Sequence, residues 1–301
     1  MNRRKFISGV LFNSVGGGLL LGSLGMLEAH AKPLMGANQT QQNRQTVVSA
    51  AQDADPLDSH VKDAINKAKY FEQDYVDDVF LSRRQLQLSR AILNRLTRLQ
   101  RFVGYANFNL IGFDSALLYA KRYSVVGRFT KREIALIEAL YIFDASNYGF
   151  LGAKVSEKLT DKIANKDVKK IAGSGHYLYQ GDALTLYLKL KKELKSDLIL
   201  TSGIRSVVKQ LHLFIAKTDK TKGNLSRAAR SLAPPGHSFH GVGDFDVGQK
   251  GLGVANFTNA FVDTDIHQRL TDLGLIAERY PKSNPYGVRH EPWHIKVIKD
   301  V

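Results

Sequence analysis

The pentapeptide H-E-P-W-H at residues 290–294 restricts the fold of this chain more than any other stretch. It fits the pattern H-E-x-x-H, which binds zinc when a helix places its two histidines one turn apart. Pro292 lies inside that turn, where it would remove a backbone hydrogen bond and clash with the turn before it. The alternation of residues 293–298 is typical of a strand, in which His290 and His294 would lie about 13 Å apart. A metal site that uses His294 must therefore take its other ligands from elsewhere in the chain.

A second fragment, residues 234–246, offers such ligands. His240 and Asp246 lie on either side of Gly241 and Gly243, which allow the backbone to turn tightly enough for both side chains to reach one ion. With His294 they would supply three ligands and leave a fourth position for water, as in a catalytic zinc site. Glu291 would then be free to take a proton from that water. Each residue also has an ordinary structural interpretation, as a hydrogen-bonded core histidine or a turn aspartate.

The amino-acid composition narrows the kind of metal site. The chain has 301 residues and no cysteine. Disulfides, thiolate zinc sites and a cysteine nucleophile are therefore excluded, and any metal must be held by nitrogen and oxygen.

The formal net charge of +15 indicates an anionic partner or a solvated basic surface. No block rich in lysine and arginine with interleaved aromatic residues stands out, which argues against nucleic acid. An anionic cell-wall surface remains as a partner.

The N-terminus predicts export. Arg3 and Arg4 precede a weakly apolar, glycine-rich run, and an A-x-A cleavage signature ends at Ala31. The pattern resembles a twin-arginine signal peptide over residues 1–31, which implies a periplasmic or extracellular protein. The run of three glycines at 16–18 argues against a membrane span, and none is expected after signal removal. Residues 32–60 are polar and rich in glutamine and asparagine, which predicts a linker.

Hydrophobic periodicity divides the rest of the chain into two domains. Residues 61–165 have helical spacing throughout and predict an all-α domain of three to five helices, one of which opens with a capping box at Thr130. Residues 166–301 mix helices with a few strands, so we expect an α+β domain. The expected elements are helices over 182–194, 207–216 and 266–275, strands over 198–201, 245–247 and 293–298, and an exposed loop at 217–222.

Three linked motifs in the last ~135 residues resemble the VanY-like D-alanyl-D-alanine carboxypeptidases, zinc peptidases of the bacterial cell wall. These are S-G-I-R-S at 202–206, A-P-P-G-H-S-F-H at 233–240 and E-P-W-H at 291–294, in the order of the family. The resemblance implies a DD-peptidase/hedgehog-like fold and a Zn²⁺ ion bound by His240, Asp246 and His294. It implies Glu291 as catalytic base and Arg205 as the group that stabilises the developing oxyanion, with Ser238 and Gln210 also on the substrate side.

One departure from the family pattern concerns the metal ligands. In the family the aspartate follows the histidine by seven positions, whereas Asp246 follows His240 by six. A shifted pair of ligands, His237 and Asp244, has the family spacing and stays open as an alternative. We favour the pair His240 and Asp246, because Ser238 and Gly243 then align with the motif.

The sequence thus predicts an exported zinc peptidase that hydrolyses an amide bond in peptidoglycan stem peptides, most simply a D-Ala-D-Ala carboxypeptidase. A peptidoglycan endopeptidase is an alternative on the same site. A second alternative is a cell-wall-binding or scaffold protein with a degenerate site, which the missing residue before Asp246 would explain.

Overall fold

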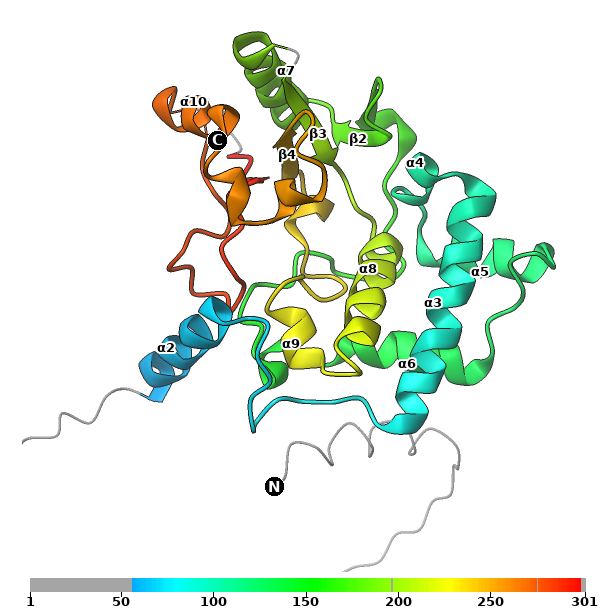
Figure 1. Ribbon diagram of the computed structural model, residues 1–301. Helices are drawn as coiled ribbons and strands as arrows, with labels where there is room; N and C mark the ends of the chain where they lie inside the picture. The colour runs from blue at the N-terminus through cyan, green and yellow to red at the C-terminus, as the bar shows by residue number, and fades with distance from the viewer. Residues whose placement is uncertain (1–55, 196, 275, 299–301) are drawn as a thin grey trace, which may run out of the picture.

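The computed structural model describes residues 56–298, except 196 and 275. Figure 1 shows the helices of residues 83–142 on one side of the molecule and the sheet above its centre, with α8 (Val207–Lys220) and α9 (Leu225–Ala229) between these helices and α2 (Pro56–Lys69), which lies on the far side. Residues 1–31, expected as an export signal, lie outside the described residues, as does most of the linker expected over 32–60. Among the described residues, no helix is long and apolar enough to cross a membrane.

The helical region, residues 56–148, forms as the periodicity predicts, with five α-helices and one 3-10 helix. These are α2 (Pro56–Lys69), α3 (Arg83–Val103), α4 (Tyr105–Phe108), α5 (Phe113–Arg122), α6 (Lys131–Ile142) and η1 (Ala145–Tyr148). The capping box expected at Thr130 is confirmed, since its side chain accepts from the Glu133 backbone while Glu133 accepts from the Thr130 backbone. Helix α2 begins at Pro56, inside the range expected as linker.

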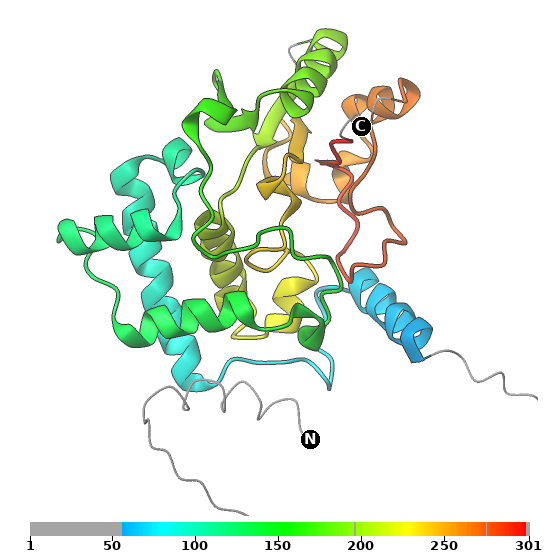
Figure 2. The same ribbon diagram turned by 180° about the vertical axis from the view of Figure 1, so that it is seen from behind.

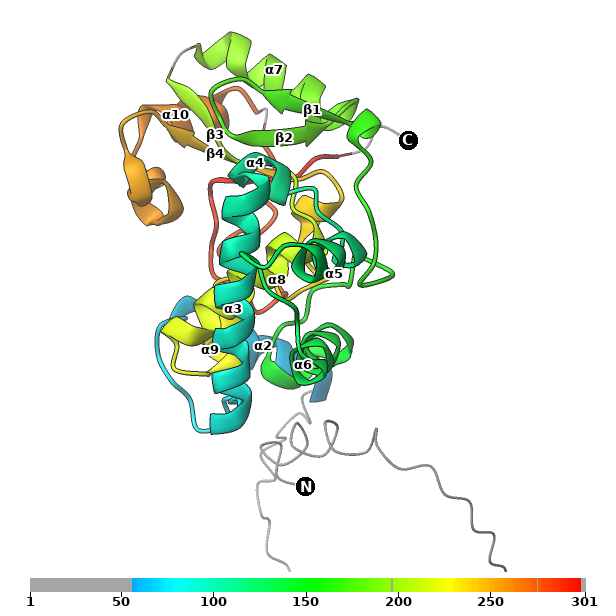
Figure 3. The ribbon, with the colours of Figure 1, turned by 90° about the vertical axis from the view of Figure 1, so that its right-hand side faces the viewer.

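The second region is α+β, as expected. Its elements are η2 (Asn165–Asp167), β1 (Val168–Ile171), β2 (His176–Tyr179), α7 (Asp182–Leu194), β3 (Leu198–Ser202), α8 (Val207–Lys220), α9 (Leu225–Ala229), η3 (Phe239–Gly241), β4 (Phe245–Gln249), η4 (Gly253–Phe257), η5 (Asn259–Phe261), α10 (Asp265–Asp272) and β5 (His294–Ile295). Strands β3, β4 and β5 form an antiparallel sheet in that order, and β1 pairs with β2 in a separate hairpin. Seen from the side in Figure 3, α7 lies over the hairpin, and the helical region lies below it.

Two of the expected elements were wrong. The stretch 217–222 is not an exposed loop, because α8 continues to Lys220 and both Thr218 and Thr221 are buried. Their hydroxyl groups donate to the backbone carbonyls of Phe214 and Asn224, which lets a polar segment be buried. The last strand is shorter than the expected 293–298, since β5 covers two residues and the Val297 amide instead donates to the Asp244 carboxylate. The β1–β2 hairpin was not predicted at all.

Two hydrophobic cores support these elements. The larger one joins the helical region to α8 and α9, with Leu96, Leu99 and Phe108 packed in the same cluster as Leu211 and Phe214. The smaller one lies beneath α7 and the three-stranded sheet and includes Phe245 and Trp293. The helical region therefore packs directly on the part of the chain that carries the motifs.

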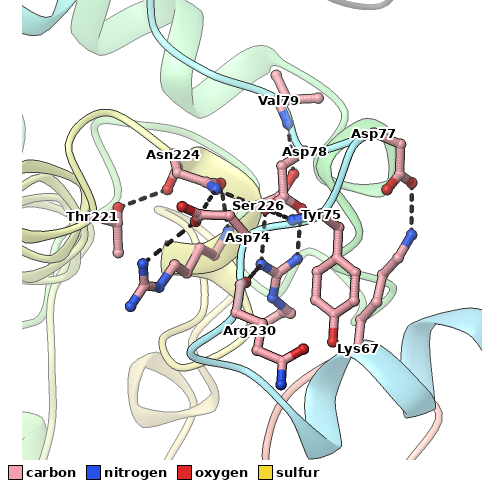
Figure 4. A network of polar contacts seen from close by, with 12 residues as sticks. Lys67, Asp74, Tyr75, Asp77, Asp78, Val79, Thr221, Asn224, Ser226 and Arg230 are labelled. Atoms are coloured by element: carbon pink, nitrogen blue, oxygen red, sulfur yellow. Dashed lines mark hydrogen bonds and ion pairs between the residues drawn. The ribbon is translucent and has the colours of Figure 1, made fainter.

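A buried polar cluster, which we call the Arg230 network, fastens the segment after α2 to α9 (Figure 4). Arg230 donates to both carboxylate oxygens of Asp78, at 2.7 and 2.9 Å, and to the Gln73 carbonyl at 2.7 Å. Asn224 donates to Asp78 and to Asp74. The side chains of Arg230 and Asp78 are 4% and 2% exposed, so this ion pair is part of the protein interior. Figure 2 shows α2 next to the C-terminal segment that follows α10.

Candidate metal centre

Strand register brings Asp246 and His294 together. Asp246 lies on the central strand β4, directly opposite His294 on β5. Directly opposed residues of an antiparallel pair present their side chains on the same face of the sheet. On the other side, a register shift in β3 places Ser202 opposite Asp246.

His240 reaches the same point from the loop that precedes β4. It lies in η3, and Gly243 after it has φ +131°, a conformation that favours glycine. The His240 Nδ1 atom lies 2.7 Å from the Gly203 carbonyl, which fixes the ring. Gly203 is itself closely packed, because a Cβ atom there would clash with the Tyr177 carbonyl.

One ligand atom from each of His240, Asp246 and His294 lies within 4.8 Å of the others. We call these residues the three-residue centre. All three are buried. The six-residue spacing between His240 and Asp246 therefore still brings the two side chains to one point.

Hydrogen bonds on the side away from Asp246 determine which nitrogen of His240 and of His294 faces the centre. A carbonyl can only accept, so His240 Nδ1 carries the proton and leaves the Nε2 lone pair toward Asp246 Oδ1, 3.3 Å away. His294 Nε2 faces the Asp244 carboxylate at 3.2 Å, which leaves Nδ1 at 3.5 Å from Asp246 Oδ1 and 3.4 Å from Glu291 Oε2. His240 Nε2 and Asp246 Oδ1 are both buried without a hydrogen-bond partner.

When His294 Nδ1 is deprotonated, the three converging atoms are all acceptors, and such a set fits a metal ion. Burial would raise the pKa of Asp246, but the neighbouring His240 and Arg205 hold it well below its usual range. Burial lowers the pKa of His294, yet the carboxylates of Asp244, Glu291 and Asp246 raise it to about 9. Without an ion this ring therefore carries a proton on Nδ1 at neutral pH, and a bound metal would displace it. Burial and then Arg205 lower the pKa of His240, which keeps that ring neutral and its Nε2 open as a ligand.

The residues expected on the substrate side border the centre. Arg205, Gln210 and Ser238 line two adjoining pockets, one of which also contains the three-residue centre and Glu291. Arg205 donates from Nη2 to Asp246 Oδ2 at 2.7 Å and from Nε to Ser202 at 2.9 Å. Its side chain is 12% exposed, so it contacts both a candidate metal ligand and the pocket. Gln210 donates to the Ala233 carbonyl and keeps its Oε1 without a partner.

The other two histidines of the motifs point elsewhere. His237 Nδ1 lies 3.1 Å from the Gly152 carbonyl, and its ring packs edge-on against Phe150. His290 Nε2 lies 3.0 Å from Glu278. Neither residue belongs to the cluster that could hold a metal. The structure thus separates His290 from His294, as the position of Pro292 predicts.

Sequence reasoning missed the partners behind His294. Asp244 accepts from His294 Nε2, from Arg279 at 2.6 and 3.1 Å and from the Val297 amide. Tyr280 packs edge-on against the His294 ring, with 5.0 Å between centroids. A carboxylate behind a histidine ligand fixes the ring and its tautomer. The motif did signal Asp244, but as an alternative ligand.

Comparison with known proteins agrees with the motifs. Residues 179–299 match the family model of VanY, described as D-alanyl-D-alanine carboxypeptidase. This segment is a VanY-like domain. No curated protein matches the chain.

Two solved structures are among those similar to this chain, both with a TM-score of 0.39. One is a vancomycin-resistance D,D-pentapeptidase VanY variant in complex with Zn(II), 18% identical, covering 52% of this chain and 89% of that one. The other is VanYB in complex with D-alanine-D-alanine, 19% identical, covering 50% and 86%. The VanY-like domain of the present chain is preceded by the helical region.

Proposed function

We propose that this protein is a zinc-dependent D,D-carboxypeptidase that removes the terminal D-alanine from peptidoglycan stem peptides. The observation that carries the proposal is the convergence of one ligand atom each from His240, Asp246 and His294, within 4.8 Å of one another, beside Glu291 in one pocket. The match of residues 179–299 to the VanY family supports the substrate.

His240, Asp246 and His294 would hold the zinc ion. Zinc, when bound, lowers the pKa of a water molecule and polarises a carbonyl group. The outer contacts of Gly203 and Asp244 orient the two rings, so that the ligand atoms need little rearrangement.

Glu291 is placed to move the proton. Its Oε2 lies 3.4 Å from His294 Nδ1, so the carboxylate reaches the immediate surroundings of the ligands without being one of them. It accepts a proton from the attacking water and returns it to the amino group of the departing D-alanine. Arg205 carries a permanent charge at the pocket wall and stabilises the negative charge on the carbonyl oxygen as it develops.

The direct experiment is to incubate the purified, zinc-loaded protein with a peptide ending in D-Ala-D-Ala and to identify the products by mass spectrometry. The proposal predicts release of one D-alanine, and a chelator should stop the reaction. Release from cross-linked peptides alone would instead indicate an endopeptidase. Absence of zinc and of any product would indicate a cell-wall-binding protein.

We further propose export by the twin-arginine route to the periplasm or the cell exterior. Arg3 and Arg4 support this proposal. Replacement of both by lysine should retain the precursor in the cytoplasm, and cell fractionation measures this. Secretion that is unaffected by the double replacement would contradict the route.

A further inference from the structure

Arg289 lies in the wall of the catalytic pocket, two residues before Glu291. It lines the same pocket as Glu291 and the three-residue centre. Its backbone amide donates to the Arg230 carbonyl at 2.8 Å, which holds this part of the chain beside α9.

Two aromatic rings hold the Arg289 guanidinium. Its Cζ atom lies 4.8 Å from the ring centroid of Phe71 and 4.9 Å from that of Trp293. Nη2 donates to the Phe257 carbonyl at 3.0 Å. Aromatic rings fix the position of a guanidinium and leave its charge in place.

The charge of Arg289 has no carboxylate partner in the described part of the chain. Three other arginines close to the pocket or its supports each pair with a buried aspartate: Arg205 with Asp246, Arg230 with Asp78, and Arg279 with Asp244. No such pair forms at Arg289, and its Nε atom is buried without a hydrogen-bond partner. A positioned cation with open donors beside a catalytic centre fits an anionic group that arrives with the substrate.

The Arg230 network explains why Phe71 stays in place. Arg230 binds the segment after α2 through the Gln73 carbonyl and through the Asp78 carboxylate, which Figure 4 shows. Its own carbonyl accepts from the Arg289 amide. Arg230 thus holds both the chain two residues after Phe71 and the backbone of Arg289. A residue outside the VanY-like domain thereby supports Arg289, which lines the pocket.

We propose that Arg289 is a specificity-determining residue that binds a carboxylate of the substrate peptide, and that Phe71 positions it. This inference rests on the proposed function. Two carboxylates of a stem peptide lie near the scissile bond, the C-terminus and the side chain of the residue that precedes the two D-alanines. Arg289 can bind either carboxylate with two parallel N–H···O hydrogen bonds.

Binding to the zinc-loaded Glu291→Gln protein tests the proposal, because this variant lacks the base and leaves the peptide intact. Calorimetric titrations use three peptides. The first is acetyl-lysyl-D-Ala-D-Ala and the second is its C-terminal amide. In the third, diaminopimelate replaces lysine and adds a side-chain carboxylate. Adding Arg289→Ala should weaken binding about 10- to 100-fold, as expected for a charged hydrogen bond. Phe71→Ala should weaken it less, and Arg289→Lys should retain part of the affinity.

The three peptides distinguish the two sources. If Arg289 binds the C-terminus, the loss is equal for both free acids and absent for the amide. If it binds the side chain, the loss is confined to the diaminopimelate peptide. Arg269→Ala removes an exposed arginine on α10 that donates to the Glu193 carbonyl, and it serves as the charge-matched control with unchanged binding.

In the otherwise wild-type protein, Arg289→Ala should raise KM and leave kcat nearly unchanged, a split that a general loss of structure would not produce. If the proteins with and without the Arg289→Ala substitution bind all three peptides with equal affinity and retain their zinc, the inference alone is overturned. A wild-type protein that neither binds nor cuts any of these peptides would instead contradict the proposed function, and the inference with it.

Discussion

Two buried clusters of charged side chains in this molecule use aspartate in opposite ways. In the Arg230 network, both oxygens of Asp78 accept hydrogen bonds from Arg230, and Oδ2 also accepts from Asn224 and the Tyr75 amide. In the three-residue centre, Asp246 Oδ1 faces two histidine nitrogens and has no hydrogen-bond partner. A carboxylate surrounded by donors is complete within the protein, whereas an oxygen that faces two ring nitrogens without a hydrogen bond can share a cation with them. The first arrangement stabilises the fold and the second provides a site.

The largest expected effect separates chemistry from metal binding within the centre. Glu291→Gln removes the proton acceptor and no ligand, so kcat should fall by about 10²- to 10⁴-fold while the zinc content stays at the wild-type value. Steady-state kinetics and metal analysis of the same preparation measure both quantities. Loss of zinc in this variant would show that Glu291 belongs to the ligands.

The next effect tests the contribution of the Arg230 network to the stability of the fold. Asp78→Asn leaves the buried Arg230 charge uncompensated, so the free energy of unfolding should fall by about 3–5 kcal/mol. Zinc stoichiometry of the folded protein should not change. Denaturant unfolding at constant zinc concentration measures this loss of stability. A variant as stable as wild type would contradict a stabilising role for the Arg230–Asp78 ion pair.

The contribution of Asp78 to the free energy of unfolding should depend on pH. Burial would raise the pKa of Asp78, but the hydrogen bonds from Arg230 and Asn224 lower it below 3.8. A lowered pKa in the folded state stabilises the protein above the unfolded value, and this contribution disappears as pH falls through the folded value. The stability difference between wild type and Asp78→Asn should therefore be constant above about pH 5 and shrink below about pH 4.

A smaller effect is expected at the carboxylate behind His294. Asp244→Asn keeps the shape of the side chain but weakens its hold on the His294 ring, so zinc affinity should fall by about 10- to 100-fold. Competition with a chromogenic chelator measures the affinity. An unchanged affinity would mean that Asp244 only pairs with Arg279.

The smallest effect concerns the alternative ligand pair. His237→Gln should leave zinc content and kcat within about twofold of wild type and should lower the free energy of unfolding by about 1 kcal/mol, since one hydrogen bond to Gly152 is lost. A large loss of zinc would favour His237 and Asp244 over His240 and Asp246.

The sequence predicted those parts of the molecule that depend on local signals. The helix at 182–194 has the expected bounds, and the capping box at Thr130 begins α6. The residues of the three-residue centre were named from motif spacing together with the resemblance to the family, and their ligand atoms lie within 4.8 Å of one another.

Contacts between distant segments were not predictable in this way. Phe71 and Trp293 meet across Arg289, and Asp78 pairs with Arg230 across 152 positions, with nothing in the spacing to relate them. The burial of Thr221 depends on hydrogen bonds that only the folded chain supplies.

The central claim is that His240, Asp246 and His294 hold one catalytic zinc ion. The most direct measurement is the zinc content of purified wild type and His294→Ala, each equilibrated with zinc, desalted and analysed for bound metal. We expect one zinc per wild-type chain and none in the variant, with D-alanine release lost in parallel. Full zinc content and full activity in His294→Ala would contradict it.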